Sequence, residues 1–517
     1  MKKKHFLGIV LGMFLILIFM AYRYNYKYWT SPPSGDWSKE VQISEGQCSG
    51  TPKIIKYGDK YIAAHDNGNM IKVIAIDPYG RVIRSKDFEG KDKLILNINL
   101  LTDGEDIYLN WITSSNMNRT VNYLKLDKDL ALKSSWQVND VNTTSQIGDS
   151  IMLTAFKNKI EFYDIRSNKK VYKEAEADMI TGQNTNSGYF IGYHEKDDFK
   201  YFCVFDGRIS EEKLAGSLMK NEGVIWKNIA ISKDDKYVYF MVEKLSKGET
   251  GEVVLLICNI QDNTIESNKL QIASIGYFYN PVAKESGKEA EFIVGCARNG
   301  LLKDKPEFDF IDISIKDKYI SERSLATKIL EGTVRPYFSD NTLIFCSSSN
   351  NHTKIYVSSQ SKSFKALNDL PRGTEKTRAL SSTAVNLLNS IIFIPFIGIS
   401  WILTGLIPIT LMGFILCDAG KENIKKTSYL IIYIITSLVK LYSIYNYAYE
   451  KNYYLLPKSL GKPFLGLGIC MVISIPCLIY AYCEFKRDVE KMPVSSFSKC
   501  IFIDSALTIL LISPYLI

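Results

Sequence analysis

A short segment of alternating apolar residues recurs seven times along this chain of 517 residues, each time after a short polar turn. Its seven occurrences begin at Tyr61, Ile107, Ile151, Tyr189, Tyr237, Phe292 and Leu343. Successive starts are 46, 44, 38, 48, 55 and 51 residues apart. A period of about 40–50 residues is typical of folds in which each repeat is one small β-sheet. Because a single sheet of this kind cannot bury both of its faces, the repeats must pack against one another.

The same repeats carry a second pattern, in which an apolar run ends in Asp or Asn before a polar turn and a return strand. It occurs at residues 74–83, 124–127, 162–168 and 310–312. The Asp side chain accepts backbone hydrogen bonds inside such a turn, and Gly or Asn tolerates positive φ there. Two coupled hairpins per repeat give four strands. We therefore predict an all-β propeller of about seven four-stranded blades, with six blades, eight blades or a pair of β-sandwiches as alternatives.

The ring of blades is expected to be closed by strands from both ends of the domain. Residues 40–44 precede the first complete repeat and alternate as a strand does. We predict that they complete the last blade, which begins near Val334. Such a closure leaves no open sheet edge. The propeller is accordingly expected to span residues 40–370.

On its period and turn pattern, the region 40–370 resembles extracytoplasmic β-propellers of the broad WD40-like and quinoprotein-like kind. The Gly-His and Trp-Asp signatures of true WD40 repeats are missing. Residues 75–80 look slightly like a quinoprotein blade motif, but the Trp of that motif is absent and no other repeat shows the pattern. This departure argues against a pyrroloquinoline quinone enzyme. The resemblance implies a propeller displayed outside a membrane.

Hydrophobic segments flank the propeller on both sides. Residues 1–5 contain three lysines and are expected to form a cytoplasmic stub. Residues 6–22 carry no charge and lack a small-x-small cleavage pattern, which favours an uncleaved signal anchor over a signal peptide. Residues 23–39 then form a juxtamembrane linker, and a second linker covers 371–388. We predict a C-terminal membrane domain at 389–517 with about four transmembrane helices, at 389–417, 428–447, 463–483 and 500–517.

The distribution of Lys and Arg sets the expected orientation in the membrane. Three precede the first span, three lie in 421–426, four in 486–499 and three in 448–462. This weak bias places the N-terminus in the cytoplasm and both the propeller and the C-terminus outside. The segment 389–417 contains Pro395 and Pro408. If it forms two short re-entrant pieces instead of one span, the loop at 421–426 would lie on the outer side of the membrane. We expect a multi-pass protein of the cell membrane, and the richness in Lys, Ile, Asn and Tyr suggests a bacterial source.

Few residues could carry chemistry. The chain has four histidines, His5, His65, His194 and His352, with no paired metal-ligand spacing. His65 and Asp66 could form an acid/base pair, but a structural pair next to a strand is the favoured interpretation. No nucleophile elbow, phosphate-binding loop or calcium loop is present. We therefore predict no catalytic residue, no metal and no cofactor.

The cysteines and the overall charge argue against a disulfide framework, a zinc site and a nucleic-acid partner. Of ten cysteines, five lie in the propeller region and five in or beside the hydrophobic tail, without CxxC spacing. Small buried hydrophobic residues are a better interpretation of them than a disulfide framework or a zinc site. The net charge of +8 is spread along the chain without a basic block, so nucleic acid is not an expected partner.

Two charged residues inside the predicted spans, Lys440 and Asp504, are the candidate functional residues, because intramembrane charges are costly. From helix starts at Ser428 and Cys500, they lie about 18 Å and about 6 Å into their helices. We therefore expect them to meet only if the two helices are offset along their axes. The favoured interpretation of Lys440 is that its side chain extends to the outer headgroups.

The sequence favours a membrane-anchored extracytoplasmic propeller that acts as a ligand-binding, protein-binding or sensory module. The alternative is a subunit of a transport, export or envelope-assembly complex, and an enzyme with a site in the propeller channel is the least favoured class. The expected partners are the lipid bilayer and either another membrane or envelope protein or an extracellular ligand.

Overall fold

The computed structural model of the chain divides into two compact units. One unit contains Pro32–Leu370, and the other contains Met1–Ser31 together with Pro371–Ile517. The structure describes residues 3–90, 94–115, 118–185, 188–218, 224–246, 251–272, 275–284, 289–298, 307–329, 332–349, 352–415, 422–450, 456–457, 460–487 and 494–516. Each unit is described by itself.

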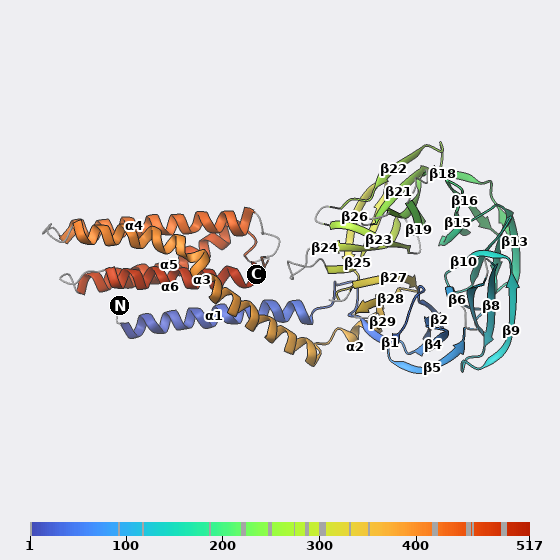
Figure 1. Ribbon diagram of the computed structural model, residues 1–517, viewed down its shortest axis with the longest axis horizontal. Helices are drawn as coiled ribbons and strands as arrows, with labels where there is room; N and C mark the ends of the chain where they lie inside the picture. The colour runs from blue at the N-terminus through green and yellow to red at the C-terminus, as the bar shows by residue number, and fades with distance from the viewer. Residues whose placement is uncertain are drawn as a thin grey trace. The chain divides into compact units, whose positions relative to one another are not determined.

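The unit Pro32–Leu370 contains seven antiparallel sheets, which we number as blades 1 to 7 (Figure 1). Blade 1 consists of β2 (Lys53–Tyr57), β3 (Lys60–Asn67), β4 (Met70–Ile76) and β5 (Val82–Glu89). Blade 2 consists of β6 (Leu94–Thr102), β7 (Ile107–Ser115), β8 (Asn118–Leu126) and β9 (Leu132–Asn139). Blade 3 consists of β10 (Val141–Ile147), β11 (Ile151–Phe156), β12 (Lys159–Asp164) and β13 (Lys169–Glu174).

The remaining blades follow the same order, with one extra strand in blade 4. Blade 4 consists of β14 (Met179–Thr185), β15 (Gly188–Glu195), β16 (Asp198–Phe205), β17 (Arg208–Ile209) and β18 (Lys213–Ser217), the last two both pairing with β16. Blade 5 consists of β19 (Val224–Lys233), β20 (Tyr237–Ser246), β21 (Glu252–Asn259) and β22 (Ile265–Lys269). Blade 6 consists of β23 (Ile275–Ala283), β24 (Ala290–Arg298), β25 (Glu307–Lys316) and β26 (Tyr319–Leu325). Blade 7 consists of β27 (Gly332–Ser339), β28 (Thr342–Ser349), β29 (His352–Ser359) and β1 (Val41–Gly46).

The prediction of seven four-stranded blades is confirmed, and the repeated segment proves to be the second strand of each blade. Its seven starts lie in β3, β7, β11, β15, β20, β24 and β28. The second strand pairs on both sides and packs against the neighbouring blades on both faces, so its residues are the most buried; residues 238–242 of β20 are all fully buried. By contrast, the outermost strands β5, β9 and β22 are largely exposed. Burial on both faces explains why this strand gives the clearest hydrophobic signal.

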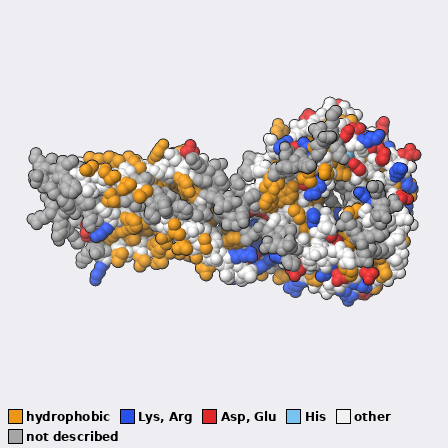
Figure 2. Space-filling model, in the orientation of Figure 1, with side chains coloured by type: hydrophobic (Ala, Val, Ile, Leu, Met, Phe, Trp, Pro, Cys, Tyr) orange, Lys and Arg blue, Asp and Glu red, His pale blue; other side chains and the backbone are white. Residues whose placement is uncertain are grey.

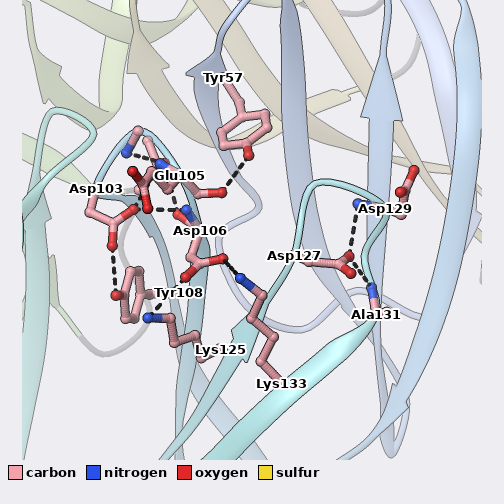
Figure 3. A network of polar contacts seen from close by, with 12 residues as sticks. Tyr57, Asp103, Glu105, Asp106, Tyr108, Lys125, Asp127, Asp129, Ala131 and Lys133 are labelled. Carbon is pink, nitrogen blue, oxygen red and sulfur yellow. Dashed lines mark hydrogen bonds and ion pairs between the residues drawn. The ribbon is translucent and has the colours of Figure 1, made fainter.

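Aspartates hold the turns between the third and fourth strands as predicted. In blade 2, Asp127 accepts hydrogen bonds from the backbone N–H groups of Asp129 and Ala131, both at 2.8 Å (Figure 3). In blade 1, Asp77 accepts from the N–H groups two and four residues later, at 2.9 and 2.8 Å. The prediction for residues 310–312 is wrong, because Asp312 lies inside β25 and is buried. The turn follows instead at Asp317, whose φ is 48°.

A second polar network connects the two outer strands of blade 2 to Asp106 (Figure 3). Asp106 forms ion pairs with Lys125 of β8, at 2.9 Å, and with Lys133 of β9. These two ammonium groups lower the pKa of the Asp106 carboxyl. In the adjoining turn, Asp103 accepts a hydrogen bond from the hydroxyl of Tyr108 at 2.7 Å. Because these side chains are paired within blade 2, and the hydroxyl of Tyr57 in blade 1 donates to the carbonyl of Glu105 in the same turn, we interpret the network as structural.

The ring closes between the two ends of the unit, as predicted. β1 pairs with β29 in antiparallel register, with Val41 opposite Val357. The connection continues before β1, where the N–H of Ser38 donates to the carbonyl of Ser359 at 3.0 Å and Trp37 is fully buried. The innermost strands contact one another in sequence, and β27 of blade 7 contacts β2 of blade 1. The helix α2 (Lys362–Asn368) ends this unit, with Phe364 buried in the core.

The other unit is helical. It contains α1 (Lys3–Thr30), α3 (Gly373–Ile415), α4 (Glu422–Ile444) continued by the π-helix η1 (Tyr445–Glu450), α5 (Pro463–Arg487) and α6 (Val494–Leu516). α6 contacts α1, α3 and α5 and is the most buried of these helices (Figure 1). The stretches expected as linkers are helical over residues 23–30 and 373–388. α1 ends just before Ser31-Pro32-Pro33, where proline disfavours a helical preceding residue.

Four helices in the described residues are long and apolar enough to cross a membrane: Lys4–Thr30, Leu430–Glu450, Pro463–Glu484 and Ser498–Leu516. One is N-terminal and three are C-terminal, where we predicted about four. The remaining predicted span, 389–417, overlaps α3 over residues 389–415, while residues 416–417 and the side chains of residues 393–398 lie outside the described residues. Hydrophobic side chains gather over the surface of the helices in Figure 2. These features are consistent with membrane association.

Candidate functional site

The two charged residues singled out in the sequence meet inside the helical unit. The ammonium group of Lys440, on α4, lies 2.9 Å from both carboxylate oxygens of Asp504, on α6. It also donates to the hydroxyl oxygens of Ser474 on α5, at 2.6 Å, and of Thr508 on α6, at 3.3 Å. All four side chains are buried. We call these four residues the polar cluster.

The expectation that Lys440 extends to the headgroups is therefore wrong, whereas the contact between Lys440 and Asp504 is the case that the sequence analysis allowed for offset helices. Counted from the observed helix starts, Lys440 is 18 residues into α4 and Asp504 is 10 residues into α6. The difference corresponds to about 12 Å along a helix. The pair still forms, because helices need not begin at one level and the lysine side chain is long. Neither the axial position nor the rotation of packed helices can be read from one sequence.

The structure adds two hydroxyl residues that the sequence analysis missed. Thr508 follows Asp504 by four residues on α6 and therefore lies on the same face. Ser474 also donates to the Asp504 carboxylate at 2.9 Å. In the sequence, Thr508 stands out as a hydroxyl residue one helical turn from the charged Asp504, and Ser474 stands out as a serine within a long apolar run. Together the four side chains give every charge a partner and connect α4, α5 and α6 in the apolar interior.

The propeller contains a separate candidate site, a central cavity of about 270 Å³. Every blade contributes to its wall, mostly through its innermost strand. The lining residues are Thr51 and Lys53 of blade 1, Asn97 of blade 2, 143–148 of blade 3, 179–184 of blade 4, 227–230 of blade 5, 281–284 of blade 6 and 336–339 of blade 7. We call this space the central cavity. No sequence motif marked it, because its wall is assembled from seven distant segments.

The charged side chains that line the central cavity are all lysines. Among the described lining residues are three lysines and no Asp or Glu. The ammonium of Lys284 is neutralised by Asp312 at 2.7 Å and Glu291 at 3.2 Å. The side chain of Lys227 is about half exposed to solvent. Lys227 also forms an ion pair with Glu243 at 3.9 Å, so Lys53 is the lining lysine that has no carboxylate partner in the described part of the chain.

Lys53 is the unusual member of this wall. It is 8% exposed, and its ammonium lies over the ring of Tyr337, 4.1 Å from the centroid. No carboxylate among the described residues pairs with it. Burial lowers the pKa of Lys53 to about 7. Its amine is consequently charged only near and below neutral pH, and it costs folding free energy unless a ligand compensates.

Side-chain amides complete the polar surface. Gln146 donates to the hydroxyl of Tyr337 at 2.6 Å and to the carbonyl of Leu100 at 3.0 Å. Gln183 donates to the hydroxyl of Ser232 at 3.0 Å, while its carbonyl oxygen is buried without a partner in the described part of the chain. Lys53 and Gln183 thus offer a buried donor and a buried acceptor to whatever enters the central cavity.

His65 and His194 both take part in structural contacts. The ring of His65 contacts the hydroxyl of Ser44 at 2.9 Å and the carbonyl of Asp66 at 2.8 Å, while the carboxylate of Asp66 accepts from the N–H of Gly50 at 2.9 Å. The pair is therefore structural, and both residues lie in β3. His194 contacts the carboxylate of Asp178 at 2.6 Å. In the described residues, no group of three or more His, Cys, Asp or Glu side chains could hold a metal ion.

Comparisons with known proteins identify no family. No protein-family model matches the chain, and no curated protein matches it. Three solved structures are similar to it: the Dos1 propeller (9% identity, 64% of this chain and 95% of that chain, TM-score 0.34), the β-propeller domain of the Trilobed protease from Pyrococcus furiosus (8%, 62% and 98%, 0.37) and an apocarotenoid oxygenase from Synechocystis (10%, 52% and 69%, 0.30). The fold assignment itself rests on the strand pairing.

Replacing Lys53 by Met is expected to stabilise the protein by about 4 kcal/mol at pH 7. The folded pKa of about 7 is below the usual value of 10.5, so the unfolded chain binds more protons between these values. The stability of the native protein should therefore rise with pH across this window, and the advantage of Lys53→Met should shrink. Urea unfolding of the full chain in mild detergent at pH 7 and pH 9.5 measures both effects.

Lys227→Met is the matched control, because this lysine lines the same cavity but is half exposed, and its ion pair with Glu243 is long, at 3.9 Å. It should change the free energy of unfolding by less than about 0.5 kcal/mol at both pH values. A Lys53→Met protein that is less stable than the native one at pH 7 would contradict the prediction.

Proposed function

We propose that this protein is a membrane-anchored extracytoplasmic propeller that binds a small anionic ligand in its central cavity and acts as a binding or sensory module. The propeller fold supports a binding or scaffold role, and the four apolar helices support the anchor. The observation that carries the proposal is Lys53, a buried amine facing a cavity without a carboxylate in its described wall. A protein keeps such a destabilising group when function requires it.

The ligand chemistry follows from the wall of the central cavity. A charged amine favours an acidic ligand, and the buried carbonyl oxygen of Gln183, which has no partner in the described part of the chain, offers an acceptor suited to a hydroxyl group. A volume of about 270 Å³ is small for a ligand pocket and admits a molecule of monosaccharide size. A hydroxylated carboxylic acid such as a sugar acid fits these conditions best.

Binding can be tested by the melting temperature of the full chain in mild detergent with galacturonate, gluconate, glucose and chloride. We expect stabilisation by the sugar acids alone, stronger at pH 6 than at pH 8.5, because the Lys53 amine is charged at the lower pH. Lys53→Met should abolish the effect and Lys227→Met should retain most of it. Equal stabilisation by glucose, or an unchanged response of Lys53→Met, would reject the anionic ligand.

The side of the membrane is tested by labelling with an impermeant maleimide on intact cells. The background carries Ala at Cys203, Cys417 and Cys483, because the seven other cysteines are buried. A cysteine in place of Lys128, which is exposed in a turn of blade 2, should be labelled from outside. A cysteine in place of Asn423, whose side chain lies outside the described residues, should react only after permeabilisation. The reverse pattern would place the propeller in the cytoplasm.

The second candidate function is a subunit of a transport, export or envelope-assembly complex. The polar cluster favours it, since charges inside apolar helices often belong to transport pathways or to helix assembly. Affinity purification from mild detergent, with identification of stoichiometric partners, distinguishes this candidate. A membrane protein that copurifies with the native chain but not with a Lys440→Met/Asp504→Leu variant would favour the complex. Copurification that persists in this variant would remove the polar cluster as support for the complex.

A further inference from the structure

Two buried cysteines that are 298 residues apart in the sequence meet where the propeller ring closes. The sulfur atoms of Cys48 and Cys346 lie 3.3 Å apart. Their exposed fractions are 7% and 0%. Both belong to one hydrophobic cluster that joins blade 7 to blade 1. A separation of 3.3 Å is shorter than an ordinary contact between two sulfur atoms, so no side chain lies between them.

Cys48 lies in the connector between β1 and β2, which carries the chain from blade 7 to blade 1. Its backbone carbonyl accepts a hydrogen bond from the guanidinium of Arg335 on β27, at 2.5 Å. The connector is also held by Asp66, whose carboxylate accepts from the N–H of Ser49 at 2.6 Å. Cys346 lies in β28, the second strand of blade 7. The connector is therefore already oriented toward its partner thiol.

We propose that Cys48 and Cys346 form a disulfide bond that locks the propeller ring. A disulfide has an S–S distance of about 2.05 Å, so the two sulfurs need to approach by about 1.3 Å from the observed 3.3 Å. Cys48 lies outside β1 and β2, so a movement of this size does not require the strand pairing to break. The bond joins the N-terminal connector covalently to the last blade, where otherwise the pairing of β1 with β29 holds the ends of the ring together.

The reaction is a thiol–disulfide exchange. The two thiols lose two protons and two electrons, and the oxidant is a second disulfide, of an oxidoreductase or of glutathione, which is reduced to two thiols. One Cys first forms a mixed disulfide, which the other Cys then displaces. The supply of this oxidant rests on the proposed extracytoplasmic placement, because disulfides persist in oxidising compartments. The reaction in the purified protein does not depend on that placement.

Burial decides when the bond can form. Both sulfurs are inaccessible in the closed ring, and the hydrogen bond from Cys346 together with burial raises the pKa of the Cys48 thiol. Little thiolate is present to attack an oxidant. The bond should therefore form while the chain folds, or when β1 transiently separates from β29. Once formed, the bond keeps the ring from opening at this joint. It also closes a loop of 298 residues in the unfolded chain, which lowers the entropy of that chain and so stabilises the folded protein.

The bond is tested directly in protein taken from membranes. Cells are lysed directly in denaturing buffer that contains N-ethylmaleimide, so that buried free thiols are also blocked, and the purified full chain is digested with trypsin without reductant. Cys48 falls in the peptide of residues 40–53 and Cys346 in that of residues 329–354, and neither contains another cysteine. We expect one linked peptide pair that separates on reduction. Both peptides carrying the maleimide would show that the thiols are free in the cell and would reject the bond in that setting.

A second measurement uses purified full-length protein and is independent of cellular location. The reduced protein is partly unfolded in urea, refolded with oxidised and reduced glutathione, and compared with the fully reduced protein. We expect oxidation to raise the melting temperature of the native chain by about 5 °C or more. Cys346→Ser should remove the difference, and Cys258→Ala, which changes a buried cysteine of blade 5, should keep it. If Cys346→Ser fails to fold, Cys48→Ser on the connector serves instead.

The outcomes separate this inference from the proposed function. A redox-dependent melting temperature that also persists in both Cys48→Ser and Cys346→Ser would overturn the disulfide, and so would two free thiols after refolding in glutathione. A bond that forms in purified protein but not in cells would instead contradict the extracytoplasmic placement. Ligand binding in the central cavity is measured with Lys53 variants and does not enter either result.

Discussion

Replacing Ile43 by Asp is expected to unfold the propeller unit or to lower its free energy of unfolding by at least about 4 kcal/mol. Ile43 lies in β1, is 8% exposed and packs in the cluster that joins blade 7 to blade 1. The substitution removes a buried side chain and places an unpaired charge in the same space. Since domains are stable by only about 5–15 kcal/mol, the ring should open at its closing strand.

The neighbouring residue provides a matched control. Gln42 lies in the same strand, is exposed and faces the opposite side. Gln42→Lys should change the free energy of unfolding by less than about 0.5 kcal/mol, as most surface substitutions do. Urea unfolding followed by tryptophan fluorescence measures both variants, because Trp37 is fully buried beside this joint. If Ile43→Asp behaves like Gln42→Lys, β1 does not contribute to the closed ring.

Deleting residues 40–44 extends the same argument. The deletion removes most of β1 and leaves the outer edge of β29 without its antiparallel partner. An unpaired sheet edge is also a template for pairing with another molecule, so the protein that remains folded should associate. We expect no folded monomer, which size-exclusion chromatography and circular dichroism detect. A monomeric deletion variant with unchanged melting temperature would show that blade 7 is complete without β1.

Breaking the ion pair in the helical unit is the second change with a large expected effect. Lys440→Met leaves the Asp504 carboxylate buried without its cation, and Asp504→Leu leaves the buried ammonium without its anion. Removing one partner of a buried pair typically costs about 3–5 kcal/mol. Each single variant should therefore lose most of its yield in membranes and melt at a lower temperature in detergent.

The double variant Lys440→Met/Asp504→Leu should recover most of this loss, because no charge then remains to be buried. We expect it within about 1 kcal/mol of the native protein, as replacement of buried pairs by apolar side chains is often neutral. Tyr442→Phe, on an exposed position of the same helix, should change nothing. Losses in the two single variants that add up in the double variant would mean that the charges do not act as a pair.

The same variants decide whether the polar cluster has a function beyond folding. A double variant that folds and reaches the membrane but abolishes the biological activity would show that the charges themselves are needed. A double variant with native activity would make the polar cluster a structural connection between helices. The sequence predicted a function for Lys440 and Asp504, and this experiment tests that prediction apart from their effect on stability.

Local patterns in the sequence were sufficient for the blades and for the closure of the ring. The second strand of each blade is buried on both faces, so its apolar run is visible at Tyr61, Tyr237 or Leu343 without any knowledge of neighbours. The turn at Asp127 depends on residues no more than four positions away. The turn expected at Asp312 failed, because the same Ile-Asp pattern there belongs to a buried strand whose aspartate pairs with Lys284, 28 residues earlier.

The sequence by itself determined the class of the protein: a repeated four-stranded blade, its number, the strand that closes the ring, and helices apolar enough for a membrane. These properties follow from hydrophobic periods and turn chemistry, which act over a few residues. The tertiary structure alone decided which distant side chains meet, as for Lys440 with Asp504, Lys53 with the central cavity and Cys48 with Cys346. These contacts depend on helix offsets and on the position of seven blades around one axis, which are set by the packing of the whole unit.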